Sequence, residues 1–182
     1  FNDLRDHEFF FHAMRTGEIL YPYREGAYDP DVKNTVDYWS INTYVRDLID
    51  ARTPTSWGSR FIFKKMKMIP TDFYLEEFNP ECIINNLSRL TDKPVYITEN
   101  GCSCDDDRFR IAFIAVYTAA VREAINLGVD VRGYLYWSML DNYEWSSYTP
   151  RFGLCSVDRS TFERTLKPSA DFYRELIAQN GV

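Results

Sequence analysis

One acidic residue of this sequence stands where a catalytic carboxylate could be held rigidly. Glu99 comes directly after residues 95–98, a short apolar run typical of a strand buried on both faces of a parallel sheet. Rigid backbone would fix its carboxylate at the mouth of that sheet, which suits a nucleophile. A strand-end acid paired with an arginine fits the position equally well, because structural ion pairs are common. Position alone leaves both interpretations open.

Other polar and aromatic side chains follow two further predicted strands. Residues 36–44 and residues 131–137 are rich in β-branched and aromatic side chains, which favours a strand in each. Asn42 and Tyr44 stand at the end of the first, and residues 137–144 follow the second. Parallel sheets and barrels keep their functional sites at the carboxyl ends of strands. One rim would therefore gather these residues with Glu99.

Helical patterns separate the predicted strands. Apolar spacing and capping residues predict helices over residues 2–17, 80–90, 105–128 and 168–181. In the third of these, the aspartates at 105–107 supply caps and Gly128 ends the helix. Residues 61–68 are predicted to be a short, half-exposed strand inside a long loop. Strands that alternate with helices imply right-handed crossovers, so the predicted class is α/β with a parallel sheet.

Composition excludes several classes of protein. The chain has 182 residues, of which 45% are hydrophobic and 26% charged, and this is globular rather than disordered, collagenous or coiled-coil composition. A net charge of −6 provides no basic face for nucleic acid. No apolar run is long enough for a membrane span. Aromatic residues make up 16%, which suits ring-lined surfaces for sugars or flat apolar ligands.

The number and spacing of the cysteines suggest a reducing compartment. The four cysteines contain no Cys-X-X-Cys pair, and a chain of this length needs no disulfide staples, so a cytoplasmic location is expected. Phe1 begins neither a signal peptide nor a chain with an initiator Met, and we expect an internal or processed start. Cys102 and Cys104 adjoin three aspartates without a nearby histidine. No metal site is expected there.

Two motifs resemble those of a known family. Residues 96–101, Tyr-Ile-Thr-Glu-Asn-Gly, resemble the nucleophile motif of family 1 glycoside hydrolases, the β-glucosidase family. Residues 137–145, with Arg-Phe-Gly-Leu at 151–154 and Val-Asp at 157–158, are similar to a second block of that family, in order and at close to the usual spacing. Residues 42–44 and 167–169 also fit, so the resemblance covers essentially the whole chain.

The resemblance implies a role for each site residue. Glu99 would attack the anomeric carbon of a sugar, forming a covalent glycosyl-enzyme that water hydrolyses with retained configuration. Tyr44 matches the tyrosine that hydrogen-bonds this carboxylate, which favours its ionised form and orients it. Asn42 matches a polar residue near the bound sugar. The residues that match the floor of the glycone subsite are Trp137, Glu144, Trp145 and Phe152.

The resemblance also implies a class of substrate. Glu144 would accept hydrogen bonds from sugar hydroxyls, and relatives that act on 6-phosphoglycosides lack the Glu144-Trp145 pair. Because a carboxylate repels phosphate, we expect unphosphorylated β-glucosides or β-galactosides and no cofactor. Taken singly, Trp137 and Phe152 fit core aromatics and Glu144 fits a surface acid. Only their joint arrangement indicates a sugar site.

The same resemblance implies that the chain is part of a larger barrel. A complete (β/α)₈ barrel takes typically about 250 residues, so residues 1–182 are interpreted as a single unit covering roughly strands six to eight and their helices. The family's acid/base glutamate lies in an Asn-Glu-Pro motif, which is absent from this sequence. We therefore expect little hydrolysis by this chain alone. The missing N-terminal half of the barrel, or self-association, is the expected partner.

Two other functions compete with the glycosidase. A non-catalytic relative could keep the fold and bind carbohydrate or protein, although the intact Ile-Thr-Glu-Asn motif at 97–100 argues against decay. A structural half-barrel could assemble with copies of itself. The residues between Trp145 and Arg151 are one fewer than the family's common spacing, and a Leu-Glu pair at 75–76 replaces the usual Trp-Glu. The loop near the glycone is therefore expected to differ in detail.

Overall fold

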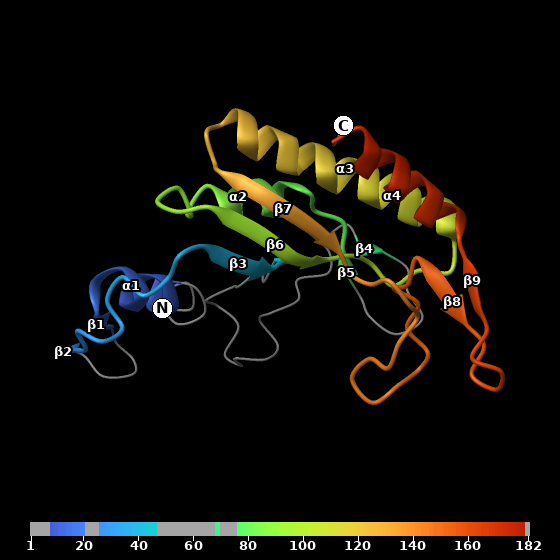
Figure 1. The fold of residues 1–182 in the computed structure, drawn as a ribbon, viewed down its shortest axis with the longest axis horizontal. Coiled ribbons are helices and arrows are strands. Elements are labelled where there is room, and N and C mark those ends of the chain that lie inside the picture. The colour runs from blue at the N-terminus through green and yellow to red at the C-terminus, as the bar shows by residue number, and fades with distance from the viewer. Residues whose placement is uncertain (1–7, 21–25, 47–67, 70–75, 181–182) are drawn as a thin grey trace. The chain divides into compact units, whose positions relative to one another are not determined.

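The structure is a computed structural model that describes residues 8–20, 26–46, 68–69 and 76–180. The chain divides into two compact units, Phe1–Trp39 and Ser40–Val182. The assignment of residues 1–182 to one barrel domain stays a prediction. Figure 1 labels the elements of both units.

The described part of the first unit contains one helix and one small hairpin. Helix α1 (Phe9–Thr16) ends at Gly17, whose φ of 80° is a left-handed value that glycine adopts without strain. Strands β1 (Glu18–Ile19) and β2 (Ala27–Tyr28) pair antiparallel. The predicted helix over residues 2–17 is confirmed in its second half, and its predicted caps at residues 2–3 lie outside the described residues.

The second unit is built on a sheet of three strands in the order β3 (Trp39–Asn42), β6 (Val95–Asn100) and β7 (Val131–Tyr136). Strands β6 and β7 are parallel, with Val95 opposite Val131 and Asn100 opposite Tyr136. All three predicted strands are therefore present and lie side by side. In the predicted strand over residues 61–68, only Met68 is described, and it begins β4 (Met68–Ile69), which pairs with β5 (Glu76–Glu77).

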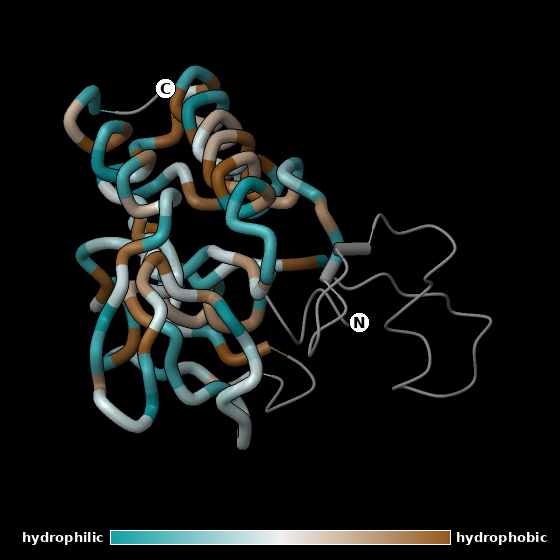
Figure 2. The backbone as a smooth tube through the Cα atoms, turned by 90° about the vertical axis from the view of Figure 1, so that its right-hand side faces the viewer, coloured by the Kyte–Doolittle hydropathy of each residue, from teal (hydrophilic) through white to brown (hydrophobic). Residues whose placement is uncertain are grey.

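Three helices accompany this sheet. They are α2 (Glu81–Leu87), α3 (Asp107–Asn126) and α4 (Pro168–Ala178). Figure 1 shows α3 and α4 side by side on one face of the sheet. Hydrophobic and hydrophilic residues alternate along the helices in the upper part of Figure 2, as expected where one helix face is buried. The core between the sheet and α3 includes Val95 and Ile97 of β6. It also includes the stacked rings of Phe113 and Tyr117 of α3, whose centroids are 3.9 Å apart.

A hairpin near the end of the chain was not expected from the sequence. Strands β8 (Cys155–Val157) and β9 (Arg164–Leu166) pair antiparallel in a stretch for which no strand was predicted. All three residues of β9 are exposed, so no alternation of apolar and polar residues marks it as a strand. The turn is held by Asp158, whose Oδ1 accepts hydrogen bonds from the backbone N–H groups of Ser160 and Thr161.

A buried charge cluster joins the start of α3 to the start of α4. Asp106 caps α3 by accepting a hydrogen bond from the N–H of Arg108, as predicted for one of the three aspartates. Asp107 instead accepts hydrogen bonds from the N–H and Oγ of Ser169, at 2.7 and 2.8 Å, and pairs with the buried Arg110. Burial alone would raise the pKa of Asp107, but these hydrogen bonds outweigh it and lower that pKa.

Apolar side chains lie uncovered around β7 and α4. Leu135, Met139, Leu166 and Ile177 are each more than half exposed, and they line a hollow of about 450 Å³. Contiguous exposed apolar surface of this kind marks interaction sites in soluble proteins. No helix among the described residues has the length and apolarity needed to span a membrane.

Candidate active site

Glu99 lies at the carboxyl end of β6 and is half-buried. Glu99 was expected directly after the strand, whereas the structure includes it as the fifth of the six residues of β6. The pairing with the neighbouring segment reaches this far, because the N–H of Thr43 donates to the carbonyl of Glu99 at 2.9 Å. Backbone hydrogen bonding thus fixes the position of the side chain more firmly than a loop would.

The carboxylate of Glu99 accepts a hydrogen bond from a tyrosine. The Tyr44 Oη donates to Glu99 Oε2 at 2.8 Å. No lysine, arginine or histidine of the described residues forms an ion pair with Glu99, so the alternative of a strand-end acid paired with an arginine finds no support in this part of the chain. A carboxylate oriented by a phenol can attack an electrophilic carbon.

Phe152 lies against the ring of Tyr44. The two rings meet edge to face, with centroids 6.4 Å apart and planes at 83°. Phe152 is 4% exposed, and its carbonyl accepts a hydrogen bond from the N–H of Ser138 at 3.4 Å. A residue from the loop after β7 therefore holds the tyrosine that orients Glu99.

Asn100 ties the strand ends together and was not singled out from the sequence. Its Nδ2 donates to the carbonyl of Thr43 at 2.6 Å, and its Oδ1 accepts from Tyr134 Oη at 2.8 Å. The carbonyl of Asn100 also accepts from the N–H of Trp137 at 2.9 Å. The signal available in the sequence was its place beside Glu99 in the motif. Because the asparagine is fully buried, it needs hydrogen-bond partners such as these.

Gly101 permits a close approach between β6 and the loop after β7. A Cβ atom at this position would lie 1.8 Å from the carbonyl oxygen of Trp137, a distance at which the backbone must move. A glycine is therefore required if Trp137 is to stay beside the end of β6.

Trp137 and Glu144 form a second polar pair at this end of the sheet. The indole Nε1 of Trp137 donates to Glu144 Oε1 at 2.8 Å, and Glu144 is only 8% exposed. An ionised carboxylate has further acceptor capacity on both oxygens, which sugar hydroxyls can use. The chain then turns through Trp145, which has a φ of 44° and is 83% exposed. Trp145 is thus the one residue of the predicted subsite floor whose side chain is largely exposed to solvent.

Asn42 lies at the end of β3. Its Oδ1 accepts a hydrogen bond from Thr98 Oγ1 at 2.7 Å, and its side chain is exposed. Because Thr98 directly precedes Glu99, this contact places Asn42 next to the segment that carries the candidate nucleophile. The structure therefore brings together all seven predicted site residues by hydrogen bonds, ring contacts or neighbouring backbone, in two groups around Glu99 and Glu144, with the side chain of Trp145 exposed.

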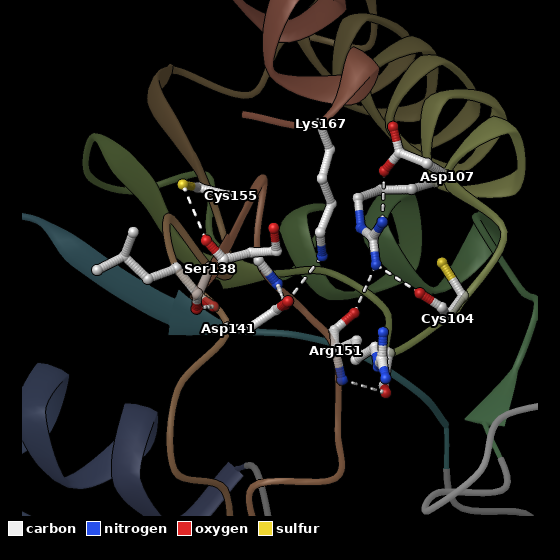
Figure 3. Close-up of polar contacts among 12 residues, drawn as sticks. Cys104, Asp107, Ser138, Asp141, Arg151, Cys155 and Lys167 are labelled. Atoms are coloured by element: carbon white, nitrogen blue, oxygen red, sulfur yellow. Dashed lines mark hydrogen bonds and ion pairs between the residues drawn. The ribbon is translucent and has the colours of Figure 1, made fainter. Parts of the chain in front are cut away.

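A buried ion pair anchors the loop that carries Trp137, Glu144 and Phe152. Figure 3 shows Lys167 reaching down to Asp141, whose Oδ1 accepts from Lys167 Nζ at 2.9 Å and from the N–H of Gly153 at 2.8 Å. Burial, together with the positive charge of Arg110, lowers the pKa of Lys167 despite its bond to Asp141. This pair was not predicted from the sequence, in which its members are 26 residues apart.

The described residues contain no group of three or more histidine, cysteine, aspartate or glutamate side chains arranged to hold a metal ion. What the arrangement offers is one oriented carboxylate, one carboxylate–indole pair and two aromatic rings around them. Such a set can bind hydroxyl groups and attack a carbon centre without a cofactor.

Comparison with known proteins decides the family. The profile of Glycosyl hydrolase family 1 matches residues 18–182. The chain belongs to this family. It is 36% identical to a β-galactosidase of Sulfolobus acidocaldarius over 185 aligned positions, covering 95% of this chain and 37% of that protein. The family 1 chain thus spans well under half the length of this relative.

A solved structure and a further relative support the same assignment. The β-glucosidase of Thermotoga maritima in complex with castanospermine superposes with a TM-score of 0.81 and 28% identity, covering 96% of this chain and 44% of that one. A protein of Oryza sativa named as a probable inactive β-glucosidase is 40% identical over 109 residues, covering 53% of this chain and 21% of that protein. The resemblance inferred from residues 96–101 and 137–158 is therefore confirmed. The described strands of this family 1 chain form no closed barrel.

Replacement of Tyr44 by phenylalanine tests the role of the phenol. The Tyr44→Phe variant keeps the ring that packs on Phe152 and removes the hydrogen bond to Glu99. If Glu99 is a glycosidase nucleophile, kcat/KM for a β-glucoside in the intact gene product, meaning the whole protein that contains residues 1–182, is expected to fall roughly 10- to 100-fold, because a hydrogen bond to a charged group contributes about 1.5–3 kcal/mol. Steady-state kinetics measure this, with the exposed Tyr28→Phe as the matched control. An unchanged kcat/KM would contradict the role.

Proposed function

We propose that the chain carries the nucleophile half of a retaining β-glycosidase and that Glu99 is the nucleophile. The observation that carries the proposal is the 2.8 Å hydrogen bond from Tyr44 to Glu99 at the carboxyl end of β6. Glu99 attacks the anomeric carbon of a β-linked sugar, the aglycone leaves, and water then releases the sugar with its original configuration. Membership in family 1 and similarity to β-galactosidases and β-glucosidases support this reaction class.

Retaining hydrolysis needs a second carboxyl group about 5–5.5 Å from the first, to protonate the leaving oxygen and later activate water. This sequence contains no Asn-Glu-Pro motif, and the chain covers 37% of its Sulfolobus relative. We propose that a segment outside residues 1–182 supplies the acid/base carboxyl. We further propose that β3, β6 and β7 correspond to strands six, seven and eight of the (β/α)₈ barrel.

The same segment is proposed to cover the uncovered apolar surface. Leu135, Met139 and Ile177 lie around β7, and β7 pairs only with β6 among the described strands. An open strand edge beside exposed apolar side chains favours association with another polypeptide. A second copy of the chain is the alternative partner.

The proposed location of the protein is the cytoplasm.

Glu144 is proposed to select sugars without phosphate. It is buried beside the indole of Trp137, so a phosphate group brought to it would meet a like charge in a poorly solvated place. The proposed substrates are therefore unphosphorylated β-glucosides and β-galactosides. Binding requires no metal or cofactor in this proposal.

The product anomer and the choice of sugar test the proposed function. The intact gene product is expected to hydrolyse an aryl β-glucoside and to release the β-anomer first, as followed by ¹H NMR before mutarotation. The corresponding 6-phospho-β-glucoside is expected to react at least about 100-fold more slowly, because like charges brought together cost several kcal/mol. Initial release of the α-anomer, or a preference for the phosphorylated sugar, would reject the proposal.

A non-catalytic binding protein is the second candidate. The observation that favours it is the 40% identity to a protein whose name describes it as a probable inactive β-glucosidase. A binder would show saturable affinity for a β-glucoside with no turnover. The intact Glu99–Tyr44 pair weighs against this candidate, because a binding protein has no need of an oriented nucleophile.

A further inference from the structure

A pair of thiols lies directly beyond the strand that carries Glu99. Cys102 and Cys104 follow the end of β6, and their Sγ atoms are 3.7 Å apart. Cys102 is completely buried and Cys104 is 6% exposed. All four cysteines of the chain lie in its described part, and none forms a disulfide. The proposed hydrolysis uses none of them.

A buried guanidinium adjoins this thiol pair. Arg110 is 1% exposed, and its Nη2 donates to the carbonyl of Cys104 at 2.6 Å. The same guanidinium donates to the carbonyl of Arg151 at 2.5 Å and pairs with Asp107. Its Nε is buried and has no hydrogen-bond partner among the described residues, so the cation keeps one donor unused. Positive charge and available donors favour a thiolate over a thiol.

The thiols of Cys104 and Cys82 are in unlike electrostatic surroundings. The hydrogen bond with Cys102, aided by the charge of Arg110, lowers the pKa of Cys104 in spite of burial. Burial raises the pKa of Cys82, in contrast, to about 11. Cys104 is therefore the better nucleophile, and Cys102 lies close enough to resolve an oxidised form of it.

We propose that Cys102 and Cys104 are a redox-active dithiol that a small peroxide converts to a disulfide. The Cys104 thiolate attacks one oxygen of hydrogen peroxide, the O–O bond breaks, and the departing hydroxide takes up a proton to become water. The Cys102 sulfur then attacks the resulting sulfenic acid, forms the S–S bond and releases the second water. Two thiols lose two electrons and two protons in total, and the peroxide gains both.

The geometry favours a small oxidant and a disulfide within one chain as the product. Only 6% of Cys104 is exposed, which suits hydrogen peroxide better than a bulky disulfide. Bond formation brings the sulfurs from 3.7 Å to about 2.05 Å, a movement of the short segment between them. No second chain is needed.

This movement reaches the active site, and this part of the inference rests on the proposed function. The Oγ of Ser103 accepts from the N–H of Arg151 at 2.9 Å, and the N–H of Cys104 donates to the carbonyl of Arg151 at 3.3 Å. Phe152, the next residue, packs against Tyr44. Closing the disulfide therefore displaces the support of Tyr44, and hydrolysis is expected to fall roughly 10- to 100-fold, the effect of a displacement of about 1 Å at a reacting group.

Mass spectrometry of the intact gene product tests the chemistry without any substrate. After brief treatment with hydrogen peroxide, the protein is expected to lose the mass of two hydrogen atoms, and the peptide that holds residues 102–104 to contain an internal disulfide. Dithiothreitol is expected to restore both the mass and the hydrolytic rate. The Cys102→Ser variant should instead retain a sulfenic acid on Cys104, which dimedone labels.

The control is Cys82→Ser, which removes a buried thiol of raised pKa and should leave oxidation of the pair unchanged. The inference is overturned if the unsubstituted protein keeps both thiols during peroxide treatment. It is also overturned if Cys82 or Cys155 reacts equally fast, or if Cys104 passes directly to the sulfinic acid. A disulfide that forms without any change in hydrolysis would overturn the link to the active site. Since the thiol readout requires no glycosidase activity, failure of the proposed function would be recognised separately.

Discussion

Replacement of Glu99 by alanine in the intact gene product is expected to lower kcat for an aryl β-glucoside by about 10⁴-fold or more, the scale on which removal of a catalytic nucleophile acts. The carboxylate is oriented by Tyr44 at 2.8 Å and lies within β6, so alanine removes the attacking group and leaves the strand intact. The variant is expected to keep the circular dichroism spectrum of the unmodified protein. Loss of activity would then report on chemistry rather than on folding.

Rescue by a small anion separates a nucleophile from a merely structural acid. Azide or formate can occupy the space vacated in Glu99→Ala and attack the anomeric carbon from the same side. Because only one displacement then occurs, the product should have inverted configuration, an α-glycosyl azide in the case of azide. The control is Glu175→Ala on the exposed face of α4, which should change neither rate nor configuration. Unchanged activity in Glu99→Ala would reject the assignment.

The second large effect concerns the chain on its own. With only one of the two required carboxyl groups, residues 1–182 are expected to hydrolyse an alkyl β-glucoside no faster than buffer does. Addition of a segment that carries the Asn-Glu-Pro motif, such as the N-terminal part of a family 1 relative, should raise the rate by at least about 10²–10⁴-fold, the contribution of general acid catalysis alone. Release of glucose, followed by a coupled assay, measures this.

The leaving group provides the control for that experiment. The leaving group of a 2,4-dinitrophenyl β-glucoside is a phenolate that departs without protonation. Hydrolysis of this glucoside should therefore depend far less on the added acid than hydrolysis of the alkyl glucoside. The same added segment with its motif glutamate changed to glutamine should fail to stimulate cleavage of the alkyl glucoside. Turnover of the alkyl glucoside at ordinary enzyme rates by residues 1–182 alone would contradict the account.

Strands and long helices were predictable from the sequence because their signals are local. Residues 95–98 form an uninterrupted apolar run, and α3 has both a capping aspartate and a glycine, Gly128, just past its end. The motif around Glu99 was recognisable for the same reason, since its residues are consecutive. Predicted features of this kind depend on neighbours within one strand or one helical turn.

Long-range polar contacts could not be read from the sequence. Asp107 is one of three consecutive aspartates, and nothing local distinguishes it from Asp106, which caps α3. Only the folded chain brings Ser169 to Asp107 and Lys167 to Asp141, across 62 and 26 residues. Strand β9 was missed for a related reason, because it is stabilised by pairing with β8 and not by a buried face of its own.

Covalent trapping of Glu99 tests the central claim most directly. Fluorine at C2 of a β-glucosyl fluoride slows formation and hydrolysis of the glycosyl-enzyme by destabilising a positively charged transition state, and fluoride leaves without an acid catalyst. The intact gene product, incubated with 2-deoxy-2-fluoro-β-glucosyl fluoride and digested, should carry one fluoroglucosyl group on the peptide containing Glu99. Attachment to any other carboxylate, or hydrolysis without a trapped intermediate, would contradict the account.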